Sequence, residues 1–253
     1  MNNFLETILE STRERVSKTT PPSLEGLSVV PSFKAALARE GVSVIAEVKK
    51  ASPSKGVIAR EFPYLEIAKE YEAAGAAAIS VLTEPSYFKG DPQYLIEIAA
   101  SVGIPVLRKD FIIDKIQIDE ARAWGASAVL LIKAALSSAE FAALYAYAKA
   151  LGLDVLCEVH NEEELAAVLD IGVDIIGINN RNLATFEVDI DTTRRLSEII
   201  RQQCGSDVVL VGESGIVTAD DVRGLGDVDA VLVGETLMKS ADKAQKIMEL
   251  GSR

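Results

Sequence analysis

The sequence predicts an α/β fold: a single closed (β/α)8 TIM barrel with an N-terminal helical extension. Three observations support this. Eight short apolar runs recur from residue 42 onward, an amphipathic stretch separates each run from the next, and a glycine often stands directly before a run. The chain has 253 residues, which suits a barrel that forms one domain of about 250 residues.

The first 41 residues stand outside this repeating pattern. Leu5, Ile8, Leu9, Thr12 and Val16 have helical spacing, and a TTPPS loop precedes a second expected helix at residues 32–41. We therefore expect residues 1–41 to form a helical extension that caps one end of the barrel. Residues 42–253 form the barrel itself, and the two parts together make one domain.

The eight apolar runs are the predicted strands. Their residues are apolar at both odd and even positions, which is typical of parallel strands buried on both faces. An open doubly wound sheet is disfavoured, because VIAEVKKASPSKG lacks the glycine fingerprint expected after its first strand. The runs cover residues 42–48, 76–84, 104–110, 126–133, 153–160, 173–181, 207–214 and 228–236.

The stretches between the runs have the periodicity and the ends of helices. PYLEIAKEYEAAG has a proline in its first turn and ends at Gly75, and three later helices are expected to end at Gly125, Gly152 and Gly172. A glycine at this position is favoured because the residue after a helix often adopts a left-handed conformation.

Composition excludes several classes of function. Lys and Arg number 26 against 38 Asp and Glu, a formal charge of −12, which argues against nucleic acid or an anionic membrane as the main partner. The N-terminus lacks the apolar core of a signal peptide, and no apolar stretch reaches the roughly 18 residues of a membrane helix. Two cysteines and one histidine are too few for a disulfide framework or a multi-histidine metal centre. We expect a cytoplasmic protein.

Ionisable side chains gather where the predicted strands end. Because all strands of such a barrel end at one mouth, these residues are the first candidates for a site. Glu47 and Lys49 are two residues apart, as are Asn179 and Arg181, so each pair points to one side of its strand. The candidates are Glu47, Lys49, Lys109, Glu158, Asn179, Arg181, Glu213 and Ser214.

Other polar residues near the strand ends are expected to have structural rather than catalytic roles. Lys50, Lys55, Arg108 and Lys133 are expected to be solvated or paired surface groups. Cys157 and His160 are expected to point away from Glu158, toward the helices.

Two glycine turns indicate a phosphate site. GESGI and LVGET place Gly215 and Gly234 after the last two strands, where bare backbone N–H groups and a helix start can bind an anion. Glu235 is expected to offer only its N–H, because its carboxylate would repel a phosphate. Phe88, in a loop after the second strand, is placed to stack on a planar ligand.

Six motifs together resemble the indole-3-glycerol phosphate synthase family of tryptophan biosynthesis. They are IAEVKKASPSKG, VLTEPSYFKGD, LRKDFIID, GINNRNLATFEVD, VGESGI and LVGETLM, and the likeness runs from about Phe33 to near the C-terminus. The resemblance implies a (β/α)8 carboxy-lyase that closes, decarboxylates and dehydrates 1-(2-carboxyphenylamino)-1-deoxyribulose 5-phosphate. The products are indole-3-glycerol phosphate, CO2 and water, and the resemblance implies no cofactor and no metal.

The resemblance also implies roles for individual residues. Lys109 is the general acid and Glu158 the general base or its charge partner, and the sequence leaves open how Glu158, Glu47 and Lys49 divide the later proton transfers. Glu47, Lys49, Asn179, Glu213 and Ser214 complete the catalytic set. The positions implied to contact the substrate and its phosphate are Ser52, Phe88, Phe111, Leu131, Arg181, Leu183, Gly215, Gly234 and Glu235.

Two other functions remain open at this stage. One is a barrel like phosphoribosylanthranilate isomerase of the same pathway, and the other is a non-catalytic barrel that binds a sugar phosphate. In each case the partner is a small molecule, here an anthranilate-derived sugar phosphate. We expect a monomer or a weak homodimer.

Overall fold

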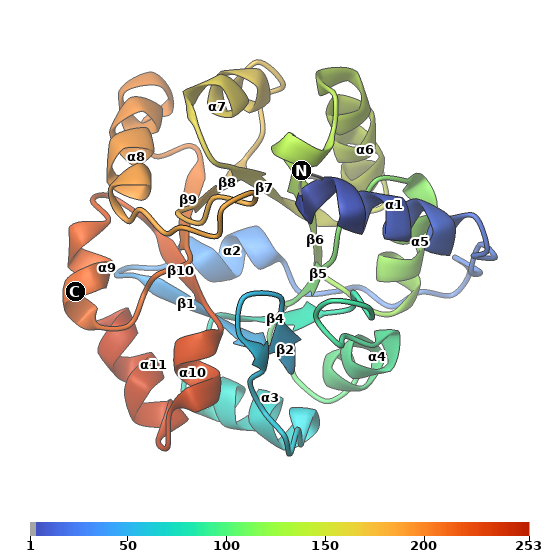
Figure 1. Cartoon of the computed structure of the whole chain (residues 1–253), viewed down its shortest axis with the longest axis horizontal. Helices are drawn as coiled ribbons and strands as arrows, with labels where there is room; N and C mark the ends of the chain where they lie inside the picture. Colours follow the sequence, from blue (N-terminus) through green and yellow to red (C-terminus); the bar gives the residue numbers. More distant parts are fainter. Residues whose placement is uncertain (1–3, 253) are drawn as a thin grey trace.

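The computed structural model describes residues 4–252 and contains the predicted closed barrel. Eight parallel strands hydrogen-bond in a ring, in the order β1, β10, β9, β8, β7, β6, β5, β4 and back to β1 (Figure 1). The strands are β1 Ser43–Val48, β4 Ala78–Leu82, β5 Val106–Lys109, β6 Ala128–Ile132, β7 Asp154–Val159, β8 Ile175–Asn179, β9 Val209–Glu213 and β10 Ala230–Val233. This confirms the predicted fold class.

Helices surround the ring of strands (Figure 1). They are α3 Tyr64–Ala73, α4 Pro92–Ala99, α5 Lys115–Ala123, α6 Ser138–Ala150, α7 Glu162–Leu169, α8 Asp191–Cys204, α9 Ala219–Gly224, α10 Glu235–Lys239 and α11 Lys243–Gly251, with a 3-10 turn η1 at Lys133–Ala135. A small hairpin of β2 Ala51–Ser52 and β3 Gly56–Val57 follows β1. Within residues 4–252, none of the helices is long and apolar enough to cross a membrane.

The four glycines expected at helix ends have the predicted conformation. Gly75, Gly125, Gly152 and Gly172 have φ values of 90°, 86°, 75° and 76°. A side chain at this φ is strained, so glycine ends each helix and lets the chain turn directly into the next strand.

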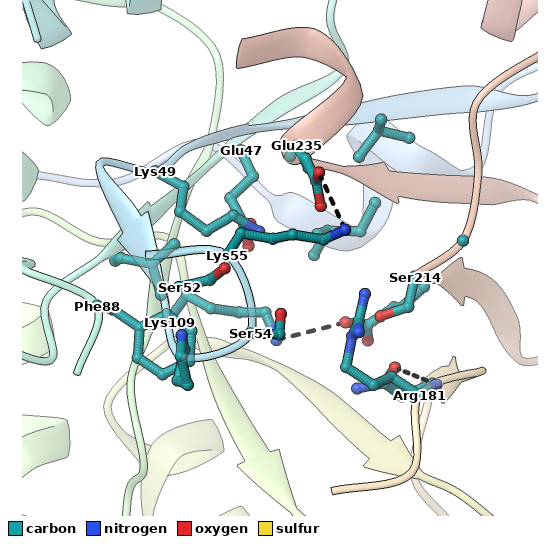
Figure 2. A pocket seen from close by; sticks show the side chains of 18 of the residues that line it. Glu47, Lys49, Ser52, Ser54, Lys55, Phe88, Lys109, Arg181, Ser214 and Glu235 are labelled. Carbon is teal, nitrogen blue, oxygen red and sulfur yellow. Dashed lines mark hydrogen bonds and ion pairs between the residues drawn. The ribbon is translucent and has the colours of Figure 1, made fainter. Parts of the chain in front are cut away.

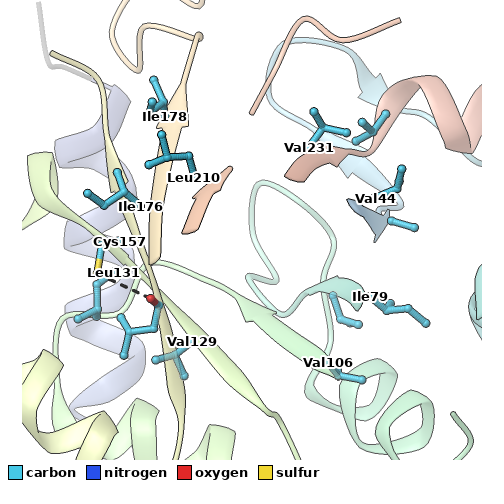
Figure 3. Packing of buried hydrophobic residues seen from close by; sticks show 14 of the residues in the cluster. Val44, Ile79, Val106, Val129, Leu131, Cys157, Ile176, Ile178, Leu210 and Val231 are labelled. Carbon is cyan, nitrogen blue, oxygen red and sulfur yellow. Dashed lines mark hydrogen bonds between the residues drawn. The ribbon is translucent and has the colours of Figure 1, made fainter. Parts of the chain in front are cut away.

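Alternate residues of each strand pack into two separate apolar layers. The outer layer lies between strands and helices and includes Val44, Val129, Cys157, Ile176 and Val231 (Figure 3). The inner layer fills the barrel and includes Ile45, Leu130, Leu156, Val211 and Leu232. Burial on both faces explains why the strands read as continuous apolar runs.

The N-terminal extension contributes one helix to each end of the barrel. Helix α1, Phe4–Val16, places Phe4 and Leu5 in the wall of a cavity at the carboxyl ends of the strands. Helix α2, Phe33–Leu37, packs Phe33 and Leu37 on the inner layer from the opposite end. There the Lys34 N–H donates to Asp154, the first residue of β7.

Two expectations for this extension need correction. It covers two ends of the barrel rather than one. The second helix is also shorter than residues 32–41, because Ala38 leaves helical geometry at φ −82° and ψ 47°.

Candidate active site

A cavity of about 610 Å³ opens at the carboxyl ends of the strands. Glu47 and Lys49 enter it from one side, and Arg181 and Ser214 from the other (Figure 2). Every predicted site residue except Leu131 lines it: Glu47, Lys49, Ser52, Phe88, Lys109, Phe111, Glu158, Asn179, Arg181, Leu183, Glu213, Ser214, Gly215, Gly234 and Glu235.

Leu131 was placed wrongly by the resemblance. Its side chain belongs to the outer apolar layer, beside Cys157 on the neighbouring strand (Figure 3). Since side chains alternate along a strand, Leu130 and Ile132 point inward instead, and both line the cavity.

Lys109 lies among carboxylates in the cavity. Its Nζ is 3.1 Å from Glu158 Oε2 and 3.4 Å from Glu213 Oε2. Burial alone would lower the pKa of this ammonium, but Glu158, Glu213 and Glu47 together raise it well above its ordinary value. Lys109 is therefore protonated before any ligand binds.

Glu158 is held in the ionised state. Burial raises the pKa of its carboxyl, but Lys109, His160 and a hydrogen bond with Asn179 outweigh burial and lower it well below its usual range. His160 Nε2 lies 3.3 Å from Glu158 Oε1. The expectation that His160 faces the helices, opposite to Glu158, is thus wrong: the two residues are two positions apart and share one side of the chain.

The pKa of Glu213 is shifted in the opposite direction, upward. Burial raises its pKa to about 7, and Glu158 and Glu47 add to this effect against Lys109. Its Oε1 has no hydrogen-bond partner among the described residues. This oxygen lies directly over Gly177 of β8, where any Cβ would overlap it. Gly177 thus leaves the room that the Glu213 side chain occupies.

Glu47 and Lys49 form a second pair at the end of β1. Glu47 Oε1 and Lys49 Nζ are 2.7 Å apart. Both press against Gly234, where a Cβ would overlap the carboxylate and stand 2.9 Å from the ammonium. The glycine of LVGET is therefore required for the close packing of this pair.

The two glycine turns lie next to each other at the cavity wall. The Thr236 hydroxyl donates to the Ile216 carbonyl at 2.7 Å and joins the turns. Ser214 and Gly215 have φ values of 68° and 81°, a left-handed conformation that is costly for serine. The Asn180 amide donates to the Ser214 carbonyl at 3.1 Å and holds this strained residue in place.

Glu235 lines the cavity, but lysines pair its carboxylate. Its Oε1 is 2.6 Å from Lys239 Nζ. The same oxygen is 3.9 Å from Lys55 Nζ (Figure 2). The hydrogen bond to Lys239 lowers the pKa of Glu235. Lys55, which the sequence placed among surface groups, lines the cavity too and adds positive charge to this corner.

Aromatic rings form the apolar part of the cavity wall. Phe88 and Phe111 have ring centroids 6.2 Å apart. The buried Glu84 carboxylate accepts from the N–H groups of Ser86, Tyr87 and Phe88 at 2.7–3.0 Å and fixes the loop that carries Phe88.

Phe4 of α1 completes this wall and was missed from the sequence. It lies 5.4 Å from Tyr87 and 5.0 Å from Phe186, measured between ring centroids. Its helical spacing gave no sign that it reaches across to these loops.

Arg108 is buried, contrary to the expectation of a surface group. Its side chain is fully inaccessible and stacks on Trp124, with 4.3 Å from the guanidinium carbon to the ring centroid. It also lies 3.1 Å from Asp110 Oδ2. Arg15 of α1 pairs with the same carboxylate through two hydrogen bonds of 2.9 and 2.7 Å. Because strand side chains alternate, Arg108 and Asp110 support β5 from outside while Lys109 points inward.

Comparison with known proteins agrees with this geometry. Residues 5–250 match the family model of indole-3-glycerol phosphate synthase. An indole-3-glycerol phosphate synthase from Endomicrobium trichonymphae is 53% identical over 87% of this chain and 84% of its own length. Another, from Desulfotalea psychrophila, is 42% identical over 99% of both chains.

A solved structure of 3-keto-L-gulonate-6-phosphate decarboxylase from Vibrio cholerae has the same fold. It aligns with a TM-score of 0.62 at 15% identity, over 83% of this chain and 95% of its own. The family match over nearly the whole chain and the relatives at 42% and 53% identity show that this chain belongs to the indole-3-glycerol phosphate synthase family, carboxy-lyases of tryptophan biosynthesis.

Proposed function

We propose that this chain carries out the indole-3-glycerol phosphate synthase reaction with Lys109 as general acid and Glu158 as general base. The observation that carries the proposal is the position of the Lys109 ammonium, 3.1 Å from Glu158 and 3.4 Å from Glu213 within the cavity. The substrate is 1-(2-carboxyphenylamino)-1-deoxyribulose 5-phosphate, and the products are indole-3-glycerol phosphate, CO2 and water.

In the first step, the aryl carbon that bears the carboxylate attacks the ribulose carbonyl. A carbon–carbon bond forms, and the carbonyl oxygen takes a proton from Lys109, which is protonated at the outset. A substrate that separates this ammonium from Glu158 moves both pKa values back toward their ordinary range, so both groups become more reactive once it is bound.

The next steps need no added electron sink. Ring closure leaves an iminium, and the electron pair released with CO2 neutralises it. Dehydration then removes one ring proton and delivers another to the leaving hydroxyl. A carboxylate and an ammonium suit this step, and the two pairs in the cavity are Glu158 with Lys109 and Glu47 with Lys49.

The two ends of the substrate fit different walls of the cavity. We place the phosphate at the joined turns of Gly215 and Gly234, with Lys55 and Arg181 nearby and Ser52 on the β2 side. The aryl ring packs against Phe88 and Phe111, with Leu183 beside it. Holding ring and carbonyl in reach of each other lowers the barrier by up to about 7–11 kcal/mol.

Turnover can be followed by the fluorescence of the indole product. Lys109→Ala is expected to lower kcat by about 100-fold or more, because it removes the general acid. Lys133→Ala is the matched control. Lys133 follows the neighbouring strand β6. Its ammonium donates a hydrogen bond to the Leu136 carbonyl, and the residue does not line the cavity.

The control variant is expected to retain wild-type turnover. Full activity in Lys109→Ala would contradict the role given to Lys109. Absence of product from the wild-type protein would contradict the whole assignment, whereas binding without turnover would favour a sugar-phosphate sensor.

We also propose a cytoplasmic monomer or weak homodimer. Cys157 and Cys204 are free thiols, which suits a reducing compartment. Light scattering over a range of concentrations measures the mass directly, and a stable trimer or tetramer contradicts this proposal.

A further inference from the structure

His160 lies between two carboxylates beside the cavity. Its Nε2 is 3.3 Å from Glu158 Oε1, and its Nδ1 is 3.0 Å from Glu164 Oε2. The side chain is only 12% exposed. The Nε2 contact is an ion pair rather than a well-directed hydrogen bond, since no hydrogen-bond partner of this atom is found among the described residues.

Glu164, in the first turn of α7, holds His160 in place through hydrogen bonds. Its Oε2 accepts the backbone N–H of His160 at 2.9 Å as well as facing Nδ1, and its Oε1 accepts the Asn161 amide at 2.9 Å. Asn161 also caps α7, since its side chain accepts the Glu164 N–H. The ring is therefore fixed by both its own backbone and the helix start.

A neutral imidazole carries one N–H, but here each ring nitrogen faces a carboxylate. Only the imidazolium, with an N–H on both nitrogens, is favourable to both contacts. Burial lowers the pKa of His160, but Glu158 and Glu164 outweigh burial and raise it to about 10.

We propose that His160 is a positioning residue: an imidazolium anchored by Glu164 that keeps the Glu158 carboxylate ionised and aims its second oxygen at Lys109. This inference rests on the proposed function, because it assigns Glu158 as the base. Glu158 then has one cation for each oxygen, His160 on Oε1 and Lys109 on Oε2.

The importance of His160 increases when substrate binds. If the carbonyl of the substrate draws the Lys109 ammonium away, His160 is the cation that remains on Glu158. Near Glu158 and His160, Glu213 lies 3.4 Å from Lys109, and Glu47 also acts on the Lys109 ammonium. The neighbouring elements carry Glu162 and Glu163, in the first turn of α7, and Lys133 on η1, which packs on β7 and α7.

The first test uses the fact that His160 is the only histidine of the chain. In protein made without a histidine tag, the ¹⁵N NMR spectrum of labelled imidazole reports this residue alone. The ring is expected to be still doubly protonated at about pH 8, where an ordinary histidine with a pKa near 6.5 is neutral. Titration near 6.5 in the wild-type protein overturns the proposal without any variant.

Two substitutions test the contacts of His160 with Glu158 and Glu164, and the ¹⁵N imidazole signal is again the measurement. Glu158→Gln and Glu164→Gln are each expected to lower the midpoint of the titration, because each removes one negative charge. Glu162→Gln is the matched control. Glu162 lies in the same helical turn, but its carboxylate pairs with Arg195 and is 52% exposed. A midpoint that stays the same in both test variants overturns the proposal.

The second test is the pH profile of turnover. His160→Gln removes the charge and is expected to move the acid limb of kcat/KM upward by about one pH unit, because Glu158 then takes up a proton more easily. The loss should lie in kcat more than in KM, since His160 does not line the cavity. His160→Lys restores a cation and is expected to move the limb back.

The outcomes separate this inference from the proposed function. If the wild-type protein forms no product, the proposed function fails, and the NMR titration still decides the state of His160. If the protein turns over and His160→Gln has the wild-type profile, only the positioning role fails.

Discussion

Glu158 and Glu213 are neighbouring carboxylates whose pKa values shift in opposite directions. Both are buried, and both lie within 3.4 Å of the same Lys109 ammonium. Glu158 also faces His160 and Asn179, whereas Glu213 Oε1 has no hydrogen-bond partner among residues 4–252. One shared cation does not ionise two buried acids, so the additional contacts decide which of them keeps the charge.

The raised pKa of Glu213 predicts a pH-dependent stability. Between the ordinary value of 4.5 and about 7, the folded protein keeps a proton on Glu213 that the unfolded chain has released. Stability contributed by this group therefore falls as pH rises through that window and is constant above it.

Glu213→Gln removes this dependence. Between about pH 5 and about pH 8, the wild-type protein is expected to lose on the order of 1–3 kcal/mol more unfolding free energy than the variant. Urea unfolding at the two pH values measures the difference. If the unfolding free energies of variant and wild type differ by the same amount at both pH values, Glu213 is ionised in the folded protein at the lower pH as well.

At the scale of elements, α1 and β5 are joined by a partly buried ion pair, in which the Asp110 carboxylate is fully buried. Asp110 follows β5 directly, between Lys109 and Phe111, and accepts two hydrogen bonds from Arg15 of α1. Burial raises the pKa of Asp110, but Arg108 and Arg15 outweigh it and lower the value. Helix α1, which lies outside the barrel pattern, thus supports the strand end that carries Lys109, the proposed general acid.

Arg15→Ala tests this support. The variant is expected to lose about 1–3 kcal/mol of unfolding free energy, because Asp110 stays buried with one cation fewer. Turnover should fall as well, since the end of β5 loses an anchor. Arg13→Ala, an exposed position of the same helix, is expected to change either quantity little. Equal effects of the two substitutions would mean that the Asp110 contact does not matter.

At the scale of the whole molecule, we propose that residues 1–41 and the barrel fold as one unit. Helix α1 contributes to the cavity wall, and α2 places Phe33 and Leu37 on the inner apolar layer at the opposite end. Both side chains are fully buried. Because Phe33 and Leu37 pack on the inner apolar layer, the extension cannot detach without exposing part of the barrel core.

Phe33→Ala tests this unity. It is expected to cost about 3–5 kcal/mol of unfolding free energy, as for other buried phenylalanines, and to leave a single transition. The fluorescence of Trp124, which lies between α5 and β6, and far-UV circular dichroism should report the same midpoint. Val29→Ala is the control, because Val29 is 97% exposed in the same extension. Separate midpoints for the two signals would show an extension that unfolds independently.

The sequence alone determined the barrel and the positions of most site residues. The reason is that local periodicity sets which face of an element is buried, and a residue at a strand end must lie at the shared mouth. The same rule of alternation also places Leu131 outside and His160 beside Glu158. The position of Leu131 was implied by the family resemblance and not by this rule, and for both residues the sequence itself holds the information that corrects the prediction.

Only the tertiary structure decided the chemistry between these residues. The protonation of Lys109, Glu158 and Glu213 depends on distances of 3.1–3.4 Å between three strands, and Lys109 and Glu158 are 49 residues apart in the chain. The burial of Arg108 against Trp124 and the reach of α1 to Asp110 are likewise set by packing. Electrostatic and packing energies depend on separation in space and exclusion of water, and neither quantity is fixed by the order of residues near each group.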